Sequence, residues 1–381
     1  MIKTNKQKAL FILHYSPPIH GAAIVGDNVK SSEIIKETFN CRFIKIDSSR
    51  ALNNIGNFSF VKFIRSVKLF IQVCHTLVFF RPSILYYTLS PNGYAFYRDF
   101  VIVAAIKFYN IFMKCNFFFH YHSSGVKSFV HGSKINKMAA NFLVKNSNII
   151  NISKFSKQDF NLLNGYSRQY ILNNGVDDNI DENEFESIIN SRLSKNPIKV
   201  FYLSNMMKGK GYDEALNLAL KIKNDYENKI EFNFAGPWES DKDANFFNDF
   251  VNNNNLENMV TYHGLVHGKQ KHKLYKDAHF FIFTSKLSEV FPLVLLEALS
   301  YGLPILAFDR GGVSEIVTTD VGRLTSPENI EKDFNILLKD FLNISTYKVC
   351  RKKFLDAYQL HVFETNLKSI LNGESIENYY N

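Results

Sequence analysis

The chain has 381 residues, enough for two domains of ordinary size, and its 46% hydrophobic and 21% charged residues are typical of a globular protein rather than a disordered one. Residues 1–178 hold 22 Lys and Arg against 8 Asp and Glu, a net of +14, whereas the remainder holds 23 against 28, a net of −5. The four cysteines, Cys41, Cys74, Cys115 and Cys350, lack metal-ligand or redox spacing, which argues against a disulfide framework and predicts reduced core residues in a cytosolic protein.

The N-terminal apolar run "ALFIL" is too short for a signal-peptide core, so it predicts a first buried strand. Similar strand-like runs alternate with helical stretches along the rest of the chain. They lie at residues 41–47, 83–89, 115–122, 148–153 and 170–175, and then at 198–204, 230–236, 259–264, 279–285 and 303–309. This alternation predicts an α/β fold of two Rossmann-like, doubly wound domains. Because ligands bind beyond the carboxyl ends of parallel strands, we expect the site in loops after strands, at a cleft that the two domains face.

The loop after the first strand reads "SPPIHGAAIVGDNVK" and leads into a helix. Gly21 would let the backbone approach a ligand closely at the N-terminus of that helix. The loop is not a G-x-G-x-x-G sequence, which argues against a dinucleotide-binding dehydrogenase.

The stretch "NFSFVKFIRSVKLFIQVCHTLVFFRPS" combines Lys62, Arg65 and Lys68 with many apolar residues. Such a pattern is typical of a helix on an anionic lipid surface, and equally of a helix packed on its own domain with solvated lysines. Lys107 and Lys114 interrupt the longest candidate for a membrane span, so no span is predicted. The basic charge would also suit nucleic acid, but no recognised nucleic-acid-binding motif accompanies it.

After the strand predicted at 115–122 comes "HYHSSGVKSF", which we expect to place His120 and His122 on opposite faces of the strand end. One would point inward and the other toward the cleft. A single histidine is more often structural, but the position at a strand end favours a role in the site.

The polar segment 179–197, closed by Pro197, predicts a linker with a short helix. Just before it, Asp177 and Asp178 suggest a metal site, but solvated acids are the favoured interpretation. The second domain then opens with "VFYLSNMMKGKGYDEAL", where Lys210 can reach a phosphate as a point charge; Lys208 is an alternative, and either lysine can be merely solvated.

In "SEVFPLVLLEALSYGLPI", Pro292 suits the first position of a helix, Gly302 the left-handed residue past its end, and Pro304 a stop. Glu297 would then be a carboxylate on a mostly buried helix, where it needs hydrogen-bond donors. Glu289 lies in the preceding loop, where the helix N-terminus attracts anions such as phosphate. The alternative is that Glu297 reaches the surface and Glu289 is an ordinary loop acid.

Together these segments resemble the retaining glycosyltransferases of the GT-B fold often called family four. The resemblance covers essentially the whole chain, through "SPPIHGAA", "SPNGYAFYRD", "HYHSSGV", "NNGVD" and "LSNMMKGKG". Its most specific part is "SEVFPLVLLEALSYGLPILAFDRGGVSEIV", which is similar to the family's E-x7-E element and the G-x-P and G-G-x-x-E segments after it.

The resemblance implies roles for individual residues. Glu297 would bind the ribose hydroxyls of a nucleotide-sugar, Glu289 would face the transferred sugar, and Lys210 and His122 match the phosphate-binding lysine and the histidine beside the sugar. Backbone amides around Phe291, Leu293 and Val294 would hold the diphosphate or sugar. Asn205 stands where the family has an arginine, which predicts weaker neutralisation of the leaving group, and "HGAA" near Gly21 departs from the family's paired glycines.

The resemblance also implies the organisation of the chain: an acceptor-binding domain over 1–178, a nucleotide-sugar-binding domain over 198–355, and a helix over 356–381 that crosses back to the first domain. The expected protein is a metal-independent, cofactor-free, hexosyltransferase-type enzyme. It would be peripheral on the cytoplasmic face of the plasma membrane, transferring a sugar to a glycan or lipid-linked acceptor in bacterial surface polysaccharide (O-antigen, capsule or lipopolysaccharide) biosynthesis, with no nucleic-acid partner. The alternatives are a nucleotide-sugar epimerase or hydrolase of the same fold, and a non-catalytic, membrane-associated assembly factor.

Overall fold

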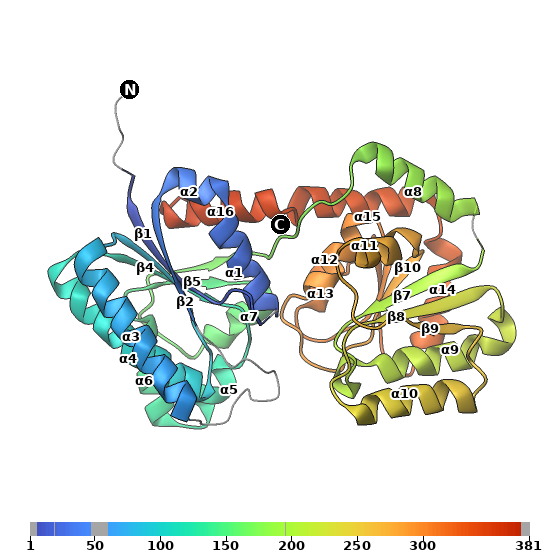
Figure 1. Cartoon of the computed structure of the whole chain (residues 1–381), viewed down its shortest axis with the longest axis horizontal. Coiled ribbons are helices and arrows are strands. Elements are labelled where there is room, and N and C mark those ends of the chain that lie inside the picture. Colours follow the sequence, from blue (N-terminus) through green and yellow to red (C-terminus); the bar gives the residue numbers. More distant parts are fainter. Residues whose placement is uncertain (1–5, 19, 47–59, 195, 375–381) are drawn as a thin grey trace. The chain divides into compact units, whose positions relative to one another are not determined.

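The structure, a computed structural model, describes residues 6–18, 20–46, 60–194 and 196–374. The chain divides into two compact units: unit 1 comprises residues 1–174 and 360–381, and unit 2 comprises residues 175–359. Each unit contains one six-stranded sheet with helices packed against it (Figure 1). All strand pairs within the two sheets are parallel, so the predicted α/β fold with two doubly wound halves is confirmed.

The sheet of unit 1 has the strand order β2-β1-β3-β4-β5-β6. Its strands are β1 Lys8–Leu13, β2 Asn40–Lys45, β3 Ile84–Thr88, β4 Asn116–Tyr121, β5 Asn148–Asn151 and β6 Arg168–Ile171. The central strands are buried on both faces, and this explains why their sequences are continuous apolar runs rather than alternating ones.

Two layers of helices cover the sheet of unit 1. The helical elements are α1 Gly21–Ser31, α2 Glu33–Thr38, α3 Phe60–Phe80, α4 Gly93–Phe112, α5 Val126–His131, α6 Lys134–Val144, α7 Lys154–Lys157, the 3-10 helix η2 Gln158–Phe160 and α16 Leu360–Leu371. Apolar residues of α3, α4, α5 and α6 form one core with the sheet. Residues of α1, α2 and α16 form the second core.

The sheet of unit 2 has the strand order β12-β11-β10-β7-β8-β9. Its strands are β7 Ile198–Leu203, β8 Ile230–Ala235, β9 Val260–Tyr262, β10 Phe280–Phe283, β11 Ile305–Phe308 and β12 Gly322–Thr325. Its helical elements are α8 Glu182–Ser194, the 3-10 helix η3 Lys208–Lys210, α9 Tyr212–Tyr226, α10 Asp241–Asn253, α11 Gly268–Asp277, α12 Leu293–Ser300, α13 Val313–Ile316, α14 Ile330–Asp340 and α15 Ile344–Ala357. The apolar runs of β7, β8 and β10 lie at the centre of its core.

Eleven strands coincide with the strands predicted from the sequence, but β12 was missed. Its sequence "GRLT" lacks the apolar run that marks the other strands, and it pairs on one side only, with β11. The predicted linker over 179–197 contains α8, whose buried Arg192 donates hydrogen bonds to the carbonyls of Tyr301 and Tyr275 within unit 2. Asp47 in the second predicted strand, and residues 375–381 of the predicted terminal helix, lie outside the described residues.

Helix α3 has the length and composition of a membrane span: the mean hydropathy of its most apolar 18-residue window is 1.5. No span was expected from the sequence, where the longest candidate was the run that Lys107 and Lys114 interrupt. In the structure, Leu69, Val73 and Leu77 of α3 are buried in the core that covers the sheet. The helix is therefore part of the helical layer on one face of the sheet of unit 1.

Candidate active site

The carboxyl ends of β7 and β10 bring two charged residues of unit 2 together. Lys210 ends the 3-10 helix η3, shortly after β7, and Glu289 lies in the loop after β10. Because β7 pairs with β10, residues that follow these strands meet at one edge of the sheet although 79 positions separate them. This edge is where the sequence predicted the site.

Lys210 and Glu289 form an ion pair in which Nζ lies 2.5 Å from Oε1. The hydroxyl of Ser285 donates a second hydrogen bond, of 2.7 Å, to the same carboxylate oxygen. The two side chains are 24% and 15% exposed, so both remain accessible to a ligand while surrounded mostly by protein. In such a setting a charge interacts with a ligand more strongly than it would in bulk water.

The backbone of Glu289 is held by the two adjacent glycines of the "GGVSE" segment. Glu289 forms a parallel bridge with Gly311, and the amide of Gly312 donates a 2.7 Å hydrogen bond to the carbonyl of Glu289. Gly311 has a φ of +67°, and a Cβ at this position would lie 2.1 Å from the carbonyl oxygen of Glu289. Only glycine fits here. The two glycines therefore help to fix the backbone of Glu289, and with it the position of the carboxylate.

Helix α12 begins immediately after this loop. Its first helical residue is Leu293 and Pro292 is the N-cap, so the expectation that Pro292 occupies the first helical position is wrong by one residue. The prediction that the helix ends at a left-handed Gly302 is confirmed, with a φ of +69°. No side chain among the described residues caps the N-terminus of α12, so the amides of Leu293 and Val294 stay available to an anion.

Phe291 precedes this N-terminus and is buried, with its ring packed edge-on against Tyr358 at a centroid distance of 5.8 Å. Its side chain therefore anchors the loop in the core of unit 2. Any contribution of Phe291 to a ligand would come from its backbone amide, as the resemblance implies.

Glu297 projects from α12 among buried Leu295, Leu296 and Ala298, and its side chain is 22% exposed. Its carboxylate has two donors: Nζ of Lys271 lies 2.7 Å from Oε1, and the hydroxyl of Tyr275 donates a 2.9 Å hydrogen bond to Oε2. These contacts satisfy a group that would be costly to bury alone.

Lys271 and Tyr275 were not among the residues predicted from the sequence. They lie four positions apart on α11, a spacing that places both side chains on one face of a helix. That spacing is present in "GKQKHKLYKD", but only the packing of α11 within unit 2 shows that this face of the helix contacts Glu297.

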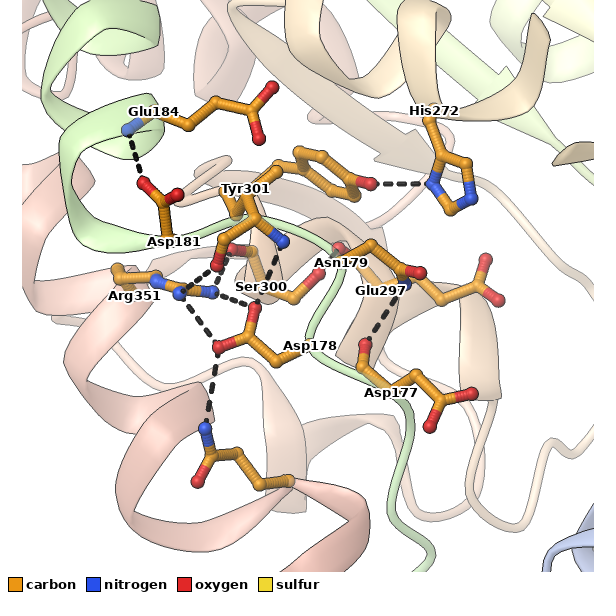
Figure 2. Close-up of polar contacts among 12 residues, drawn as sticks. Asp177, Asp178, Asn179, Asp181, Glu184, His272, Glu297, Ser300, Tyr301 and Arg351 are labelled. Atoms are coloured by element: carbon orange, nitrogen blue, oxygen red, sulfur yellow. Dashed lines mark hydrogen bonds and ion pairs between the residues drawn. The ribbon is translucent and has the colours of Figure 1, made fainter. Parts of the chain in front are cut away.

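Figure 2 shows the polar contacts on the other side of Glu297, whose carboxylate points away from them. Arg351 of α15 binds both carboxylate oxygens of Asp178, each at 2.8 Å, and also donates to the carbonyl of Ser300. Asp177 is exposed. This pairing makes Asp178 a structural anchor rather than a metal ligand, and among the described residues no group of three His, Cys, Asp or Glu side chains is arranged to hold a metal ion.

The other lysine of the "KGKG" turn has a different environment. Nζ of Lys208 lies 4.2 Å from the centroid of the Phe246 ring, a cation–π contact, whereas Lys210 pairs with Glu289. Lys210 is therefore the lysine that the fold brings to the predicted acid. Asn205, which follows β7, is half-buried.

In unit 1, His120 and His122 lie at the carboxyl end of β4. Their rings are 4.0 Å apart, so the expectation that they occupy opposite faces is wrong. Residues two positions apart in an extended chain point to the same side, and this period should have been applied to the sequence. His120 is buried and hydrogen-bonded through Nδ1 to the hydroxyl of Tyr86, while His122 is half-buried.

Two further histidines of unit 1, His14 and His20, have ring centroids 5.7 Å apart. Burial, with smaller contributions from Arg98, His20 and His122, lowers the pKa of His14 to about 3. Burial likewise lowers the pKa of His122 to about 3, with a smaller contribution from His20. Both imidazoles are therefore neutral near pH 7, and each offers one hydrogen-bond donor and one acceptor.

Gly21 is the first residue of α1, and the side chain of His20 caps the helix by accepting a 3.3 Å hydrogen bond from the amide of Ala23. A Cβ at Gly21 would meet no atom within 4 Å, so the fold itself does not require glycine here. The space beside it is compatible with the predicted close approach of a ligand.

The Lys210–Glu289 and Lys271–Glu297 pairs both lie inside one segment that matches a known protein family. Residues 183–352 match the family model described as glycosyl transferases group 1. A putative colanic acid biosynthesis glycosyltransferase, WcaL of Escherichia coli (strain K12), is 23% identical over 192 residues, which cover 46% of this chain and 45% of the relative. The match thus spans less than half the length of that curated relative.

Solved structures resemble the whole fold. A glycosyltransferase from Rickettsia africae ESF-5 has a TM-score of 0.71 and 14% sequence identity, with 97% of this chain and 100% of that chain covered. Alr3699/HepE of Anabaena, solved in complex with UDP and glucose, has a TM-score of 0.67 and 16% identity, with 96% and 100% covered. The chain therefore shares the fold of these glycosyltransferases, and its residues 183–352 match the family model of glycosyl transferases group 1.

Proposed function

We propose that this protein is a retaining glycosyltransferase that moves a sugar from a nucleoside-diphosphate sugar to a glycan or lipid-linked acceptor. The observation that carries the proposal is the half-buried Lys210–Glu289 pair beside the uncapped N-terminus of α12, within the segment that matches glycosyl transferases group 1. A cation and free helix amides at one sheet edge suit a diphosphate, and a carboxylate next to them suits sugar hydroxyls.

The donor would be held by unit 2. The diphosphate would accept hydrogen bonds from Lys210 and the first amides of α12, and Glu297 would accept them from the ribose hydroxyls. In the structure both acids contact lysines. Donor binding would move the ammonium of Lys210 from Glu289 toward the phosphate. The carboxylate of Glu289 could then accept a hydrogen bond from a sugar hydroxyl. Structures related in fold include one bound to UDP and glucose, which supports this class of donor.

In the proposed reaction, the bond between the anomeric carbon and the diphosphate oxygen breaks, and the bond to the acceptor oxygen forms on the same face of the sugar. The departing diphosphate oxygen takes the acceptor proton. Lys210 and the α12 amides stabilise the negative charge that develops there, and Asn205 adds only a neutral amide. This scheme needs neither a metal nor another cofactor. His122 of unit 1, neutral near pH 7, would offer a hydrogen-bonding group to a sugar hydroxyl.

We propose that unit 1 binds the acceptor. We also propose that the protein acts in bacterial surface polysaccharide biosynthesis, at the cytoplasmic face of the plasma membrane. The colanic acid relative supports the pathway class, and the net charge of +14 over residues 1–178 suits a diphosphate-linked glycan or an anionic lipid surface. The alternatives are an epimerase or hydrolase that acts on the nucleotide-sugar alone and a non-catalytic assembly factor.

A panel of nucleotides and nucleotide-sugars, screened by thermal unfolding and then by transfer, tests the proposal. A true donor at 100 times its dissociation constant should raise the free energy of unfolding by about 2.7 kcal/mol. Glycosylated acceptor with retained anomeric configuration is expected, whereas a new or hydrolysed nucleotide-sugar without acceptor identifies the epimerase or hydrolase. Glu289→Gln should abolish the product in cells; unchanged product would indicate the assembly factor. The absence of stabilisation by every nucleotide would refute the donor assignment.

A further inference from the structure

The outer faces of α3, α4 and α6 carry an unusual number of exposed apolar side chains. In the described residues of unit 1, every large apolar side chain that is exposed lies on one of these three helices or at Met113, the C-cap of α4. Phe60, Ile111 and Ile135, one on each helix, are 71%, 74% and 76% exposed. We call this surface the apolar face; exposed apolar side chains that gather on one side of a soluble protein mark an interaction surface.

The three helices form one continuous layer. Helix α4 contacts both α3 and α6, and Figure 1 shows the three next to one another on one side of the sheet of unit 1. Their inner sides are already used, because Val73, Val103 and Leu143 are buried in the core. The exposed side chains therefore belong to the opposite, outward side of the layer.

All charged side chains that are exposed on this layer are basic. The three helices contain basic residues and only one acid, Asp99, which is buried and bonded to Arg98 and Tyr87. Lys68 of α3 and Lys134 and Lys137 of α6 are exposed. A surface that combines apolar side chains with exposed cations and lacks exposed acids is complementary to an anionic lipid bilayer.

Two other occupants fit less well. A second copy of the chain, docked symmetrically on the same face, would bring cations against cations, which is unfavourable in an interface. A membrane-crossing α3 would have to withdraw Leu69, Val73 and Leu77 from the core of unit 1. The apolar face can instead meet a bilayer while unit 1 remains folded.

We propose that the apolar face of α3, α4 and α6 docks in the headgroup region of an anionic bilayer, with its aromatic and aliphatic side chains at the acyl boundary and its lysines on lipid phosphates. Because the helix that follows a strand in a parallel α/β unit starts at the carboxyl edge of the sheet, the start of α3, with the exposed Phe60, lies toward the edge that carries His122. Docking would hold this edge close to the headgroups, where a lipid-linked acceptor is presented. This inference deepens the proposed membrane location by naming the surface responsible.

Binding of the full chain to vesicles, with no sugar present, tests the docking surface. We expect binding to vesicles of phosphatidylcholine mixed with phosphatidylglycerol, and much weaker binding to phosphatidylcholine alone or in high salt. The variant Lys68→Glu/Lys134→Glu/Lys137→Glu should weaken binding to the anionic vesicles by about 100-fold or more, because each basic residue near the surface contributes about a factor of five. The variant Phe108→Ser/Ile111→Ser/Phe112→Ser should weaken it comparably through lost insertion.

Matched controls in unit 2 are the triple variants Lys269→Glu/Lys273→Glu/Lys339→Glu and Leu193→Ser/Leu220→Ser/Ile344→Ser, which change exposed residues of the same types. They should bind anionic vesicles as the unchanged protein does, and circular dichroism should show all four variants folded. The proposal is overturned if both vesicle types bind equally, if the unit 2 variants lose as much binding, or if resistance to carbonate extraction shows α3 to span the bilayer. If the unchanged protein binds no vesicles but forms a dimer, and the Phe108→Ser/Ile111→Ser/Phe112→Ser variant is a monomer, the apolar face is an interface between copies of the chain instead.

Transfer to a short, soluble acceptor separates this inference from the proposed function. Variants of the apolar face should retain that transfer while losing vesicle binding. If the protein binds vesicles but transfers no sugar, the proposed docking surface is supported and the proposed enzymatic function is refuted.

Discussion

The two units share one architecture but differ in the chemistry at the carboxyl edges of their sheets. Unit 2 places ion pairs there, Lys210–Glu289 and Lys271–Glu297, whereas unit 1 places the half-buried, neutral imidazoles of His14 and His122. The parallel sheet determines where a ligand can bind, and the side chains after the strands determine which ligand it is. In this protein the charged edge suits a diphosphate donor, and the neutral edge suits a hydroxyl-rich group.

The outer surfaces differ as well. Exposed large apolar residues are few and scattered in the described part of unit 2, but in unit 1 they gather on α3, α4 and α6. The chain also changes charge, from a net of +14 over residues 1–178 to −5 over the remainder. Under the proposed function each unit would meet a different partner, and variants confined to one unit should alter one property alone.

Removal of the cation at the edge of unit 2 should have the largest effect. We expect Lys210→Met to lower kcat by about 100-fold to 1,000-fold, because the leaving diphosphate would lose its stabilising charge. Steady-state kinetics with saturating donor measures this. Lys286→Met, which removes a lysine that pairs with Asp213 and Glu214 on the same side of the domain, is the control and should change kcat less than about twofold. Equal losses in the two variants would contradict the assignment.

A methyl group at Gly311 should disturb the same edge through the backbone. The Cβ of Gly311→Ala would lie 2.1 Å from the carbonyl oxygen of Glu289, so the loop must move, at a cost of about 1 to 3 kcal/mol in unfolding free energy. We expect kcat to fall with it, because Glu289 is displaced. Gly132→Ala in unit 1, where a Cβ meets only an oxygen at 3.9 Å, should leave both quantities nearly unchanged.

Loss of the carboxylate charge at Glu297 should act on donor binding. We expect Glu297→Gln to weaken donor affinity by about 10-fold, since hydrogen bonds from ribose hydroxyls to a carboxylate are stronger than those to an amide. Isothermal titration with the donor identified by the panel measures it. Glu184→Gln removes an acid that pairs with Lys276 in unit 2 and should leave the affinity unchanged. A wild-type affinity for Glu297→Gln would show that this acid only anchors Lys271 and Tyr275.

The last prediction is a pH dependence of the stability of unit 1. His14 and His122 have a folded pKa of about 3, below the unfolded value of 6.5, so the unfolded chain binds more protons between these values. The free energy of unfolding of unit 1 should therefore fall as the pH falls below about 6.5 toward about 3. Hydrogen exchange of the β1 and β4 amides, followed from about pH 7 to about pH 5, should show faster opening at the lower pH.

His14→Gln/His122→Gln should reduce this pH dependence, because the double variant lacks two imidazoles that bind protons more weakly in the folded state than in the unfolded state. The exposed His131, at the end of α5, supplies the control His131→Gln, which should retain it. A wild-type pH profile in the double variant would show that other groups destabilise unit 1 in acid.

The sequence by itself determined the alternation of strands and helices, because the sheet strands are buried on both faces and must be apolar runs. It also marked the helix end at Gly302 and the loop position of Glu289. The placement of Glu289 and Lys210 at one edge could be expected, since all strands of a parallel sheet end at the same edge, but their pairing depends on β10 lying beside β7. The face of β4 occupied by His120 and His122 was equally available from the period of two, and was misread.

Only the tertiary structure decided which side chains complete the site. Lys271 and Tyr275 become partners of Glu297 because α11 packs beside α12, and no local pattern encodes that packing. The role of Gly311 likewise depends on a contact with Glu289 that is distant in the chain. The sequence also left open whether α3 is packed or exposed, because one helix shows its apolar residues but not its neighbours. Contact with the sheet and with α4 resolves this: one side of α3 is core, and the other side remains apolar and uncovered.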